Sequence, residues 1–131
     1  MAIQWERREQ EWTVQWFKLK YPNILIAASA NGGTRNVREA ANMKREGVLA
    51  GMPDLQVMCA KRNYHGLFIE MKAPGSDSHA KGKVNMIQKC IINQLNAAGY
   101  YAVVCWGYEE ARKVIDWYIQ GESDGTAPIN K

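Results

Sequence analysis

LFIEMK at residues 67–72, preceded by GMPDL at residues 51–55, is the stretch that decides the fold of this 131-residue chain. The side chains of a strand alternate between its two faces, so the apolar residues 67, 69 and 71 share one face. Burial of that face places the carboxylate of Glu70 beside the ammonium group of Lys72 on the other. Asp54 opens a second short apolar run, residues 55–60, and pairing of the two runs as a hairpin would bring Asp54 close to Glu70.

Two carboxylates and a lysine form a site for a hard divalent cation with a positive group beside it. Mg²⁺ prefers carboxylate oxygens, and a cation held in this way can promote hydrolysis of a phosphodiester. We expect Asp54 and Glu70 to bind the cation, and Lys72 to orient and help deprotonate the attacking water or to support the charged transition state. In the alternative interpretation Asp54 is a turn residue after Pro53, and Glu70 and Lys72 are a solvated pair.

The segments around this core form a longer pattern, with NGGTR at 31–35, EGVLAGMPDL at 46–55, GLFIEMK at 66–72 and then Gln88. Upstream, Glu6 and Gln10 are followed by WF at 16–17 and YP at 21–22. In order and spacing the pattern resembles the VRR-NUC (virus-type replication-repair nuclease) family of the PD-(D/E)xK nuclease superfamily, in particular its stand-alone phage and bacterial members. The resemblance runs from about residue 6 to residue 118.

The resemblance implies a site for Mg²⁺ or Mn²⁺ with two further ligands. The backbone carbonyl at Met71 would complete the ligand set, as in the superfamily, and Glu6 matches the family's first-helix acid, a second-metal or water-mediated ligand. Gln10, one turn after Glu6, could hold Glu6 or a metal-bound water. Judged from its neighbours alone, Glu6 could equally be a solvated helix carboxylate that pairs with nearby charges.

Gln88 belongs to the helix predicted at residues 84–98, after the strand at 66–72. It flanks the apolar face of that helix. Its amide can therefore point inward beside the sheet. A satisfied half-buried amide and an active-site contact both fit this position, and the resemblance favours the contact.

Several polar and cationic side chains are expected to bind DNA phosphates near this site. Charge runs are usually solvated faces, and the net charge of +4 favours a polyanionic partner only modestly. No helix carries a recognisable set of base-reading side chains, so sequence-specific cleavage is the less favoured variant. The expected DNA-binding residues are Asn31 and Arg35 around a glycine turn, Arg38, Lys44 and Arg45 on a helix, and Lys81 and Lys83 in a loop.

Length and composition predict a single domain, residues 1–120, followed by a frayed tail, residues 121–131, and the resemblance implies that this domain is a nuclease domain. Hydrophobic residues make up 47% of the chain, and no apolar run reaches the length of a membrane span. Residues 1–15 are charged and rich in Trp, unlike a signal peptide, so the expected location is the cytoplasm, and the resemblance implies that of a bacterium or a phage host. Cys59, Cys90 and Cys105 lack CxxC spacing and are expected to be reduced core residues without zinc.

Hydrophobic periodicity predicts an α/β fold in the order α-β-α-β-β-α-β-α, a mixed sheet flanked by helices as in the nuclease superfamily. The expected helices cover residues 3–20, 36–46, 84–98 and 108–119, and the expected strands cover 24–29, 55–60, 66–72 and 100–106. Residues 73–83 are a predicted loop, and the crossover after residue 72 predicts parallel pairing of the last two strands. The third helix is expected to bury Val84, Ile87, Ile91, Leu95 and Ala98.

The predicted function is a divalent-metal-dependent DNA endonuclease. Stand-alone members of the family are dimeric four-way (Holliday) junction resolvases, so the resemblance implies a homodimer that acts on branched DNA. A two-fold dimer supplies the two symmetric cuts that a junction requires. A nucleic-acid-binding module of the same fold without catalysis, and a structural or adaptor protein, are the alternatives. The tryptophans and tyrosines are expected to lie mostly in the core, with part of the partner surface drawn from Trp12, Trp16, Phe17, Trp106, Tyr108, Trp117 and Tyr118.

Overall fold

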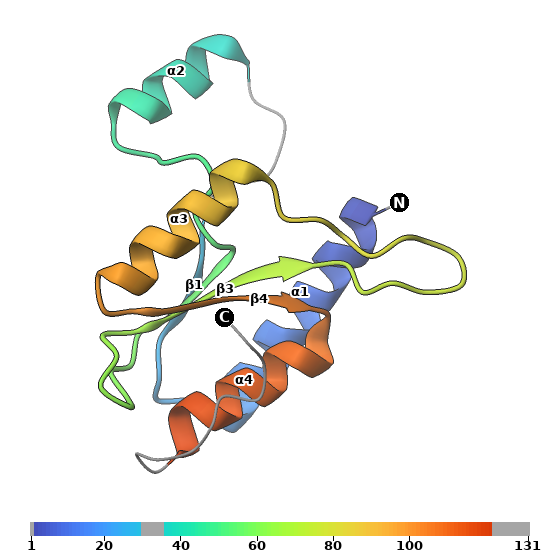
Figure 1. Cartoon of the computed structure of the whole chain (residues 1–131), viewed down its shortest axis with the longest axis vertical. Coiled ribbons are helices and arrows are strands. Elements are labelled where there is room, and N and C mark those ends of the chain that lie inside the picture. Colours follow the sequence, from blue (N-terminus) through green and yellow to red (C-terminus); the bar gives the residue numbers. More distant parts are fainter. Residues whose placement is uncertain (1, 30–35, 122–131) are drawn as a thin grey trace.

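The structure is a computed structural model that describes residues 2–29 and 36–121. The element order is α-β-α-β-β-α-β-α, so the predicted fold class is confirmed (Figure 1). Asn31 and Arg35 lie outside the described residues, as does the predicted tail after residue 121. The elements are α1 (Ala2–Lys20), β1 (Ile26–Ala28), α2 (Val37–Arg45), β2 (Leu55–Val57), β3 (Leu67–Lys72), α3 (Met86–Ala97), β4 (Tyr101–Trp106) and α4 (Tyr108–Gln120).

The four strands form one mixed sheet in the order β1-β2-β3-β4. β2 is antiparallel to β1 and to β3, whereas β3 and β4 are parallel, as predicted for the crossover through α3. Leu55 lies opposite Ile69 in the antiparallel pair. Asp54, directly before β2, therefore lies beside the second half of β3, which is the placement that the hairpin prediction required.

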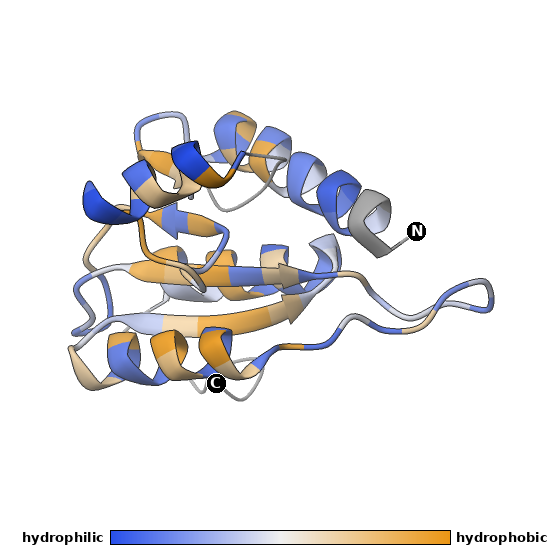
Figure 2. Ribbon diagram, turned by 90° about the horizontal axis from the view of Figure 1, so that it is seen from above, coloured by the Kyte–Doolittle hydropathy of each residue, from blue (hydrophilic) through white to orange (hydrophobic). Residues whose placement is uncertain are grey.

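The sheet is covered on both faces. Leu67, Ile69 and Met71 belong to the main core, together with Phe17 of α1 and Tyr118 of α4. On the other face Phe68 packs with Ile92 of α3 and with Ala102. The predicted alternation along β3 is therefore confirmed, and the strands are the most hydrophobic part of the ribbon, while much of α1 toward its N-terminus is polar (Figure 2).

Caps define the ends of the two helices that flank the site. The side chain of Asn36 accepts a hydrogen bond from the N–H of Glu39 at the start of α2. Gly47, with φ of +105°, ends this helix as predicted, because glycine adopts the left-handed region without a Cβ penalty. α3 begins with a capping box in which Asn85 and Gln88 each accept from the other's backbone N–H.

β1 and β2 are shorter than predicted, with three residues each in place of the expected six. The ladder ends where Met58 donates to Leu25 and Cys59 donates back to Val57, so the chain turns away from the sheet at this point. The polar turn that follows includes Arg62 and Asn63, both with positive φ. Periodicity signals an apolar run but does not mark this turn within it.

The predicted apolar face of α3 is wrong at both of its ends. Ile87 is 56% exposed and Ala98 is also exposed, whereas Ile91 and Ile92 are buried. Only the middle of the helix covers the sheet. Its first turn instead meets the segment before β2, where a Cβ on Gly51 would come within 2.6 Å of Ile87 Cγ2.

Several predicted surface and core assignments also need correction. Phe17 and Tyr118 are fully buried in the core and cannot belong to a partner surface. Cys90 is exposed and so is not a core residue, although Cys105 is buried. None of the five tryptophans is fully buried, although Trp16 and Trp117 are half-buried against the main core.

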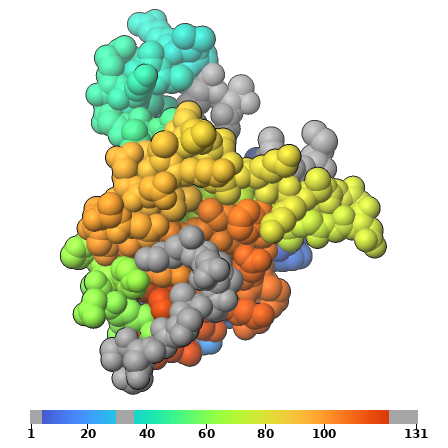
Figure 3. All heavy atoms as spheres, in the orientation of Figure 1, coloured from blue at the N-terminus to red at the C-terminus, as the bar shows by residue number. Residues whose placement is uncertain are grey.

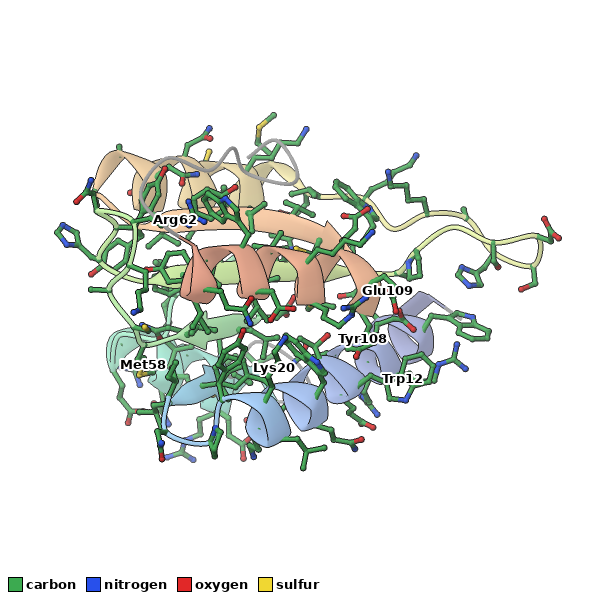
Figure 4. All side chains as sticks on the ribbon, turned by 90° about the horizontal axis from the view of Figure 1, so that it is seen from below. Trp12, Lys20, Met58, Arg62, Tyr108 and Glu109 are labelled. Atoms are coloured by element: carbon green, nitrogen blue, oxygen red, sulfur yellow. The ribbon has the colours of Figure 1, made fainter. Side chains whose placement is uncertain are left out.

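Trp12 is the most exposed of the tryptophans, at 44%. Its ring meets Tyr108 edge to face, with centroids 6.5 Å apart, at the junction of α1 and α4 (Figure 4). None of the helices in the described part of the chain is long and apolar enough to cross a membrane.

Candidate metal centre

Three carboxylates converge at one point of the fold. Glu6 comes from the N-terminal part of α1, Asp54 from the residue before β2, and Glu70 from β3. One oxygen of each carboxylate lies within 4.8 Å of the others. Residues 48 and 64 positions apart in the sequence are thus brought to one point by the packing of α1 against the central strands.

Asp54 is held by the strands on both sides of it. The backbone N–H of Ser29 donates to the Asp54 carbonyl at 2.9 Å, and the Ser29 hydroxyl donates to the Pro53 carbonyl at 2.9 Å. The Met71 N–H donates to Asp54 Oδ2 at 2.8 Å. These bonds fix the position of the Asp54 carboxylate beside β3.

The Met71 carbonyl points toward the same side of β3 as Asp54. Within a strand the N–H and C=O of one residue point in the same direction, and those of the next residue point oppositely. The Lys72 carbonyl accepts from Gly107 on the β4 side, so the Met71 carbonyl faces β2. The register continues to Pro53 opposite Met71, and proline has no N–H to donate to that carbonyl.

Glu70 is the most deeply buried of the three acids, with 2% of its surface exposed. Its Oε2 accepts a hydrogen bond from Gln88 Nε2 at 3.2 Å and lies 3.4 Å from Lys72 Nζ. Its Oε1 is buried and has no hydrogen-bond partner among the described residues. Lys72 is itself 7% exposed, so the solvated pair of the alternative interpretation is wrong. Gln88 of α3 contacts Glu70, and Gly82 of the loop after β3 lies against the Lys72 side chain.

The cluster perturbs the acids in the direction expected of crowded carboxylates. Burial and the adjacent Asp54 raise the pKa of Glu70 to about 8, against an opposing effect of Lys72. Burial also raises the pKa of Glu6, with Lys72 lowering it and Asp54 raising it further. Desolvated carboxylates that repel one another favour the protonated form when no cation is close by.

These features fit a hard divalent cation. A buried carboxylate oxygen without a hydrogen bond is costly, and a cation would satisfy it. Two or three carboxylates with a backbone carbonyl nearby are the all-oxygen donor set that Mg²⁺ and Mn²⁺ prefer. Such a cation would also offset the mutual repulsion of Glu6, Asp54 and Glu70.

The predicted DNA-binding residues lie at two places around this centre. Arg38, Lys44 and Arg45 are exposed on α2, and Lys83 is exposed in the loop between β3 and α3, which extends away from the body (Figure 1). Lys81 in the same loop lies 4.2 Å from the centre of the Trp106 ring. Among the described cations, Lys72 is the one that forms an ion pair with the cluster, at Glu70.

Sequence reasoning missed two residues that hold the cluster. Asn85 pairs with Gln88 in the capping box, and an Asn three residues before a Gln at a predicted helix start is a recognisable signal of that motif. Ser29, directly after β1, positions Pro53 and Asp54, and no local pattern marks it. Its role depends on the pairing of two strands whose lengths were mispredicted.

A mixed sheet flanked by helices, with a Pro-Asp and a Glu-x-Lys on adjacent antiparallel strands, defines the PD-(D/E)xK nuclease-like class of fold. The chain belongs to the VRR-NUC domain family, whose family model matches residues 2–109. This membership indicates a nuclease.

A solved structure described as a "VRR_NUC domain protein" is similar to this chain, with 33% sequence identity and a TM-score of 0.73. The similarity covers 95% of this chain and 97% of that one. A comparison with curated proteins finds no match.

Proposed function

We propose that this protein is a Mg²⁺- or Mn²⁺-dependent DNA endonuclease that hydrolyses phosphodiester bonds. The observation that carries the proposal is the cluster of Glu6, Asp54 and Glu70, with its buried, unpartnered Glu70 Oε1 and with Lys72 beside it. Membership of the VRR-NUC domain family supports this proposal, because the family is one of nuclease domains.

In this proposal Asp54 and Glu70 are direct metal ligands. The Met71 carbonyl, next to Glu70 on β3, completes the set of ligands. Glu6 is a further ligand, either direct or through water. A bound ion would neutralise charge on the phosphate and lower the pKa of the attacking water. The role of these residues is to hold the ion in place.

Lys72 is the candidate for orienting the attacking water and for stabilising the negative charge that develops on the phosphate. Its burial against Glu70 keeps the ammonium group in one place and strengthens its electrostatic effect relative to a solvated lysine. Gln88 holds Glu70 from the α3 side and restricts the rotation of that carboxylate.

We further propose that the substrate is branched DNA, in particular a four-way junction, and that the enzyme acts as a homodimer. One copy offers one cluster, and two cuts placed symmetrically across a junction require two clusters related by a two-fold axis. The exposed cations on α2 and in the loop between β3 and α3 would contact phosphates outside the scissile position.

The test is a cleavage assay on linear duplex, flap, splayed-arm and four-way junction substrates, with Mg²⁺, with Mn²⁺ and with EDTA. We expect metal-dependent cleavage that is fastest on the junction and absent in EDTA. Binding of DNA without nicking in any divalent ion would favour a binding module of the same fold instead. Absence of both binding and cleavage would favour a structural or adaptor role.

A further inference from the structure

A groove of about 870 Å³ lies between α2, the segment before β2 and the first turns of α3. α2 projects beyond α3 at one end of the molecule (Figure 3). The groove walls are mostly apolar, and their large apolar side chains are those of Met43, Val48, Leu49, Met52, Ile87 and Ile91.

Several apolar side chains of the groove are exposed to solvent and do not pack into either core of the sheet. Leu49 is 53% exposed and Ile87 is 56% exposed, and α2 has no buried residue. Contiguous apolar surface of this kind on a folded chain marks a place where something else packs. Packing among residues 2–29 and 36–121 therefore leaves these groove walls uncovered.

The groove is continuous with the candidate metal centre. Asp54 and Gln88 belong to both, so a molecule lying in the groove adjoins whatever is held by the carboxylates. Lys44 and Asn85 supply the groove with a cation and an amide. A ligand with an apolar face, hydrogen-bonding edges and a negative charge matches this lining.

We propose that the groove receives an unpaired nucleotide of the DNA substrate next to the scissile phosphate, an inference that rests on the proposed nuclease function. Grooves of roughly 300–1,000 Å³ take ligands of the size of one nucleotide. In a duplex the faces of the bases are covered by stacking, and only an unstacked base can place its face against apolar side chains. Lys44 contacts a phosphate of that nucleotide.

This assignment explains why a nuclease without a base-reading helix would discriminate between DNA structures. A bulge offers an unpaired nucleotide, and an open junction interrupts base stacking at its branch point, whereas a continuous duplex must first break its stacking. The selection of substrate is then made within one protomer, beside the metal centre, rather than by the dimer alone.

The test measures binding of DNA that carries the fluorescent base 2-aminopurine, in EDTA so that no cleavage occurs. In one substrate the probe is a single-nucleotide bulge, and in the other it is paired in a continuous duplex of the same sequence. We expect tighter binding of the bulged substrate and a change in its fluorescence. Equal binding of the two substrates would overturn the proposal.

Two pairs of variants locate the nucleotide. Ala40→Trp fills the groove from α2, and Val37→Trp places the same ring on the same helix at a residue that is 87% exposed and outside the groove. Ile87→Asn makes the α3 wall polar, and Met86→Asn changes its exposed neighbour outside the groove. We expect Ala40→Trp and Ile87→Asn to weaken binding of the bulge by about tenfold, the contribution of one stacked base.

The controls Val37→Trp and Met86→Asn should bind like the unchanged protein. Equal effects of groove and control variants would refute the groove as the site while metal-dependent cleavage persists. If Ala40→Trp instead abolishes a dimer seen by light scattering, the occupant is a second copy and the proposal is wrong. If no DNA is cleaved with any metal ion, the proposed function itself fails.

Discussion

Gln88 joins the start of α3 to the carboxylate of Glu70. Its Oε1 accepts from the backbone N–H of Asn85 at 3.0 Å, and its Nε2 donates to Glu70 Oε2 at 3.2 Å. One side chain therefore uses both ends of its amide, one to cap a helix and the other to orient a candidate metal ligand.

We expect Gln88→Ala to lower kcat by about tenfold or more, because Glu70 loses its orienting donor. The control is Asn85→Ala, which removes the other half of the capping box and leaves the amide of Gln88 in place. Because Asn85 also lines the groove, the two variants are compared at saturating enzyme, where weaker binding of DNA does not change the rate. Loss of a cap costs about 1 kcal/mol of stability, so both variants should melt at a lower temperature. Single-turnover cleavage rates that fall equally in the two variants would show that only the helix end matters.

Asp54→Asn and Glu70→Gln should each abolish metal-dependent cleavage and weaken the binding of Mn²⁺. Both variants should remain folded, and their metal-free forms should melt at a temperature equal to or higher than that of the unchanged protein, because a repulsion is removed. Isothermal titration with Mn²⁺ and thermal melts in EDTA measure the two effects. Near-normal cleavage by Glu70→Gln would overturn the assignment of the metal centre.

Lys72→Met should reduce the rate of cleavage by about a hundredfold or more, which is the usual contribution of a positioned acid, base or charge. The substitution keeps the length of the side chain and leaves the carboxylates in place, so the affinity for Mn²⁺ should be largely retained. Cleavage rates at saturating metal, compared with metal affinity from titration, separate the two quantities. A loss of metal binding equal to the loss of rate would assign Lys72 a purely structural role.

The metal-free protein should become less stable as the pH rises from about 5 to about 8. Glu70 binds its proton more tightly in the folded protein, with a pKa of about 8 against an ordinary value of 4.5, so the folded state holds more protons in this window. The contribution of this proton to the free energy of unfolding is fully present below the pKa of the unfolded chain. It is lost as the pH rises through the pKa of Glu70 in the folded protein. Thermal melts in EDTA across this range should show the decline.

The Glu70→Gln variant is the control for this pH dependence, since it cannot lose the proton. Its melting temperature should vary less over the same range. Added Mn²⁺ should stabilise the unchanged protein more at high pH than at low pH, because metal and proton compete for the same carboxylate. A decline that is identical in the variant would assign the effect to other groups.

A homodimer in solution is the prediction that concerns assembly. Light scattering at micromolar concentration should give twice the mass of the chain. Under saturating enzyme a four-way junction should be cut at two symmetric positions, on two of its strands. A monomer, or a junction nicked on one strand only, would contradict the dimer and leave the metal chemistry unaffected. Phe17 and Tyr118, fully buried here, do not contribute to the interface.

Local periodicity was sufficient to predict the order of the elements and the two faces of β3. Alternation over residues 67–72 depends only on the geometry of an extended chain, and it placed Glu70 and Lys72 together without reference to any other segment. Gly47 as the end of α2 was predictable for the same reason, since its positive φ is a local requirement. The resemblance to a nuclease family also came from residues read in sequence order.

Packing between distant segments decided the features that local patterns could not reach. Whether Glu70 and Lys72 are solvated or buried depends on how α3 and the loop before it pack on their face of the sheet. The placement of Glu6 depends on how α1 packs against the central strands. Ile87 was predicted to be buried and lies in an exposed groove, because only the middle of α3 covers the sheet. Periodicity reports which side chains share a face, whereas burial and charge proximity depend on what lies opposite that face in the folded chain.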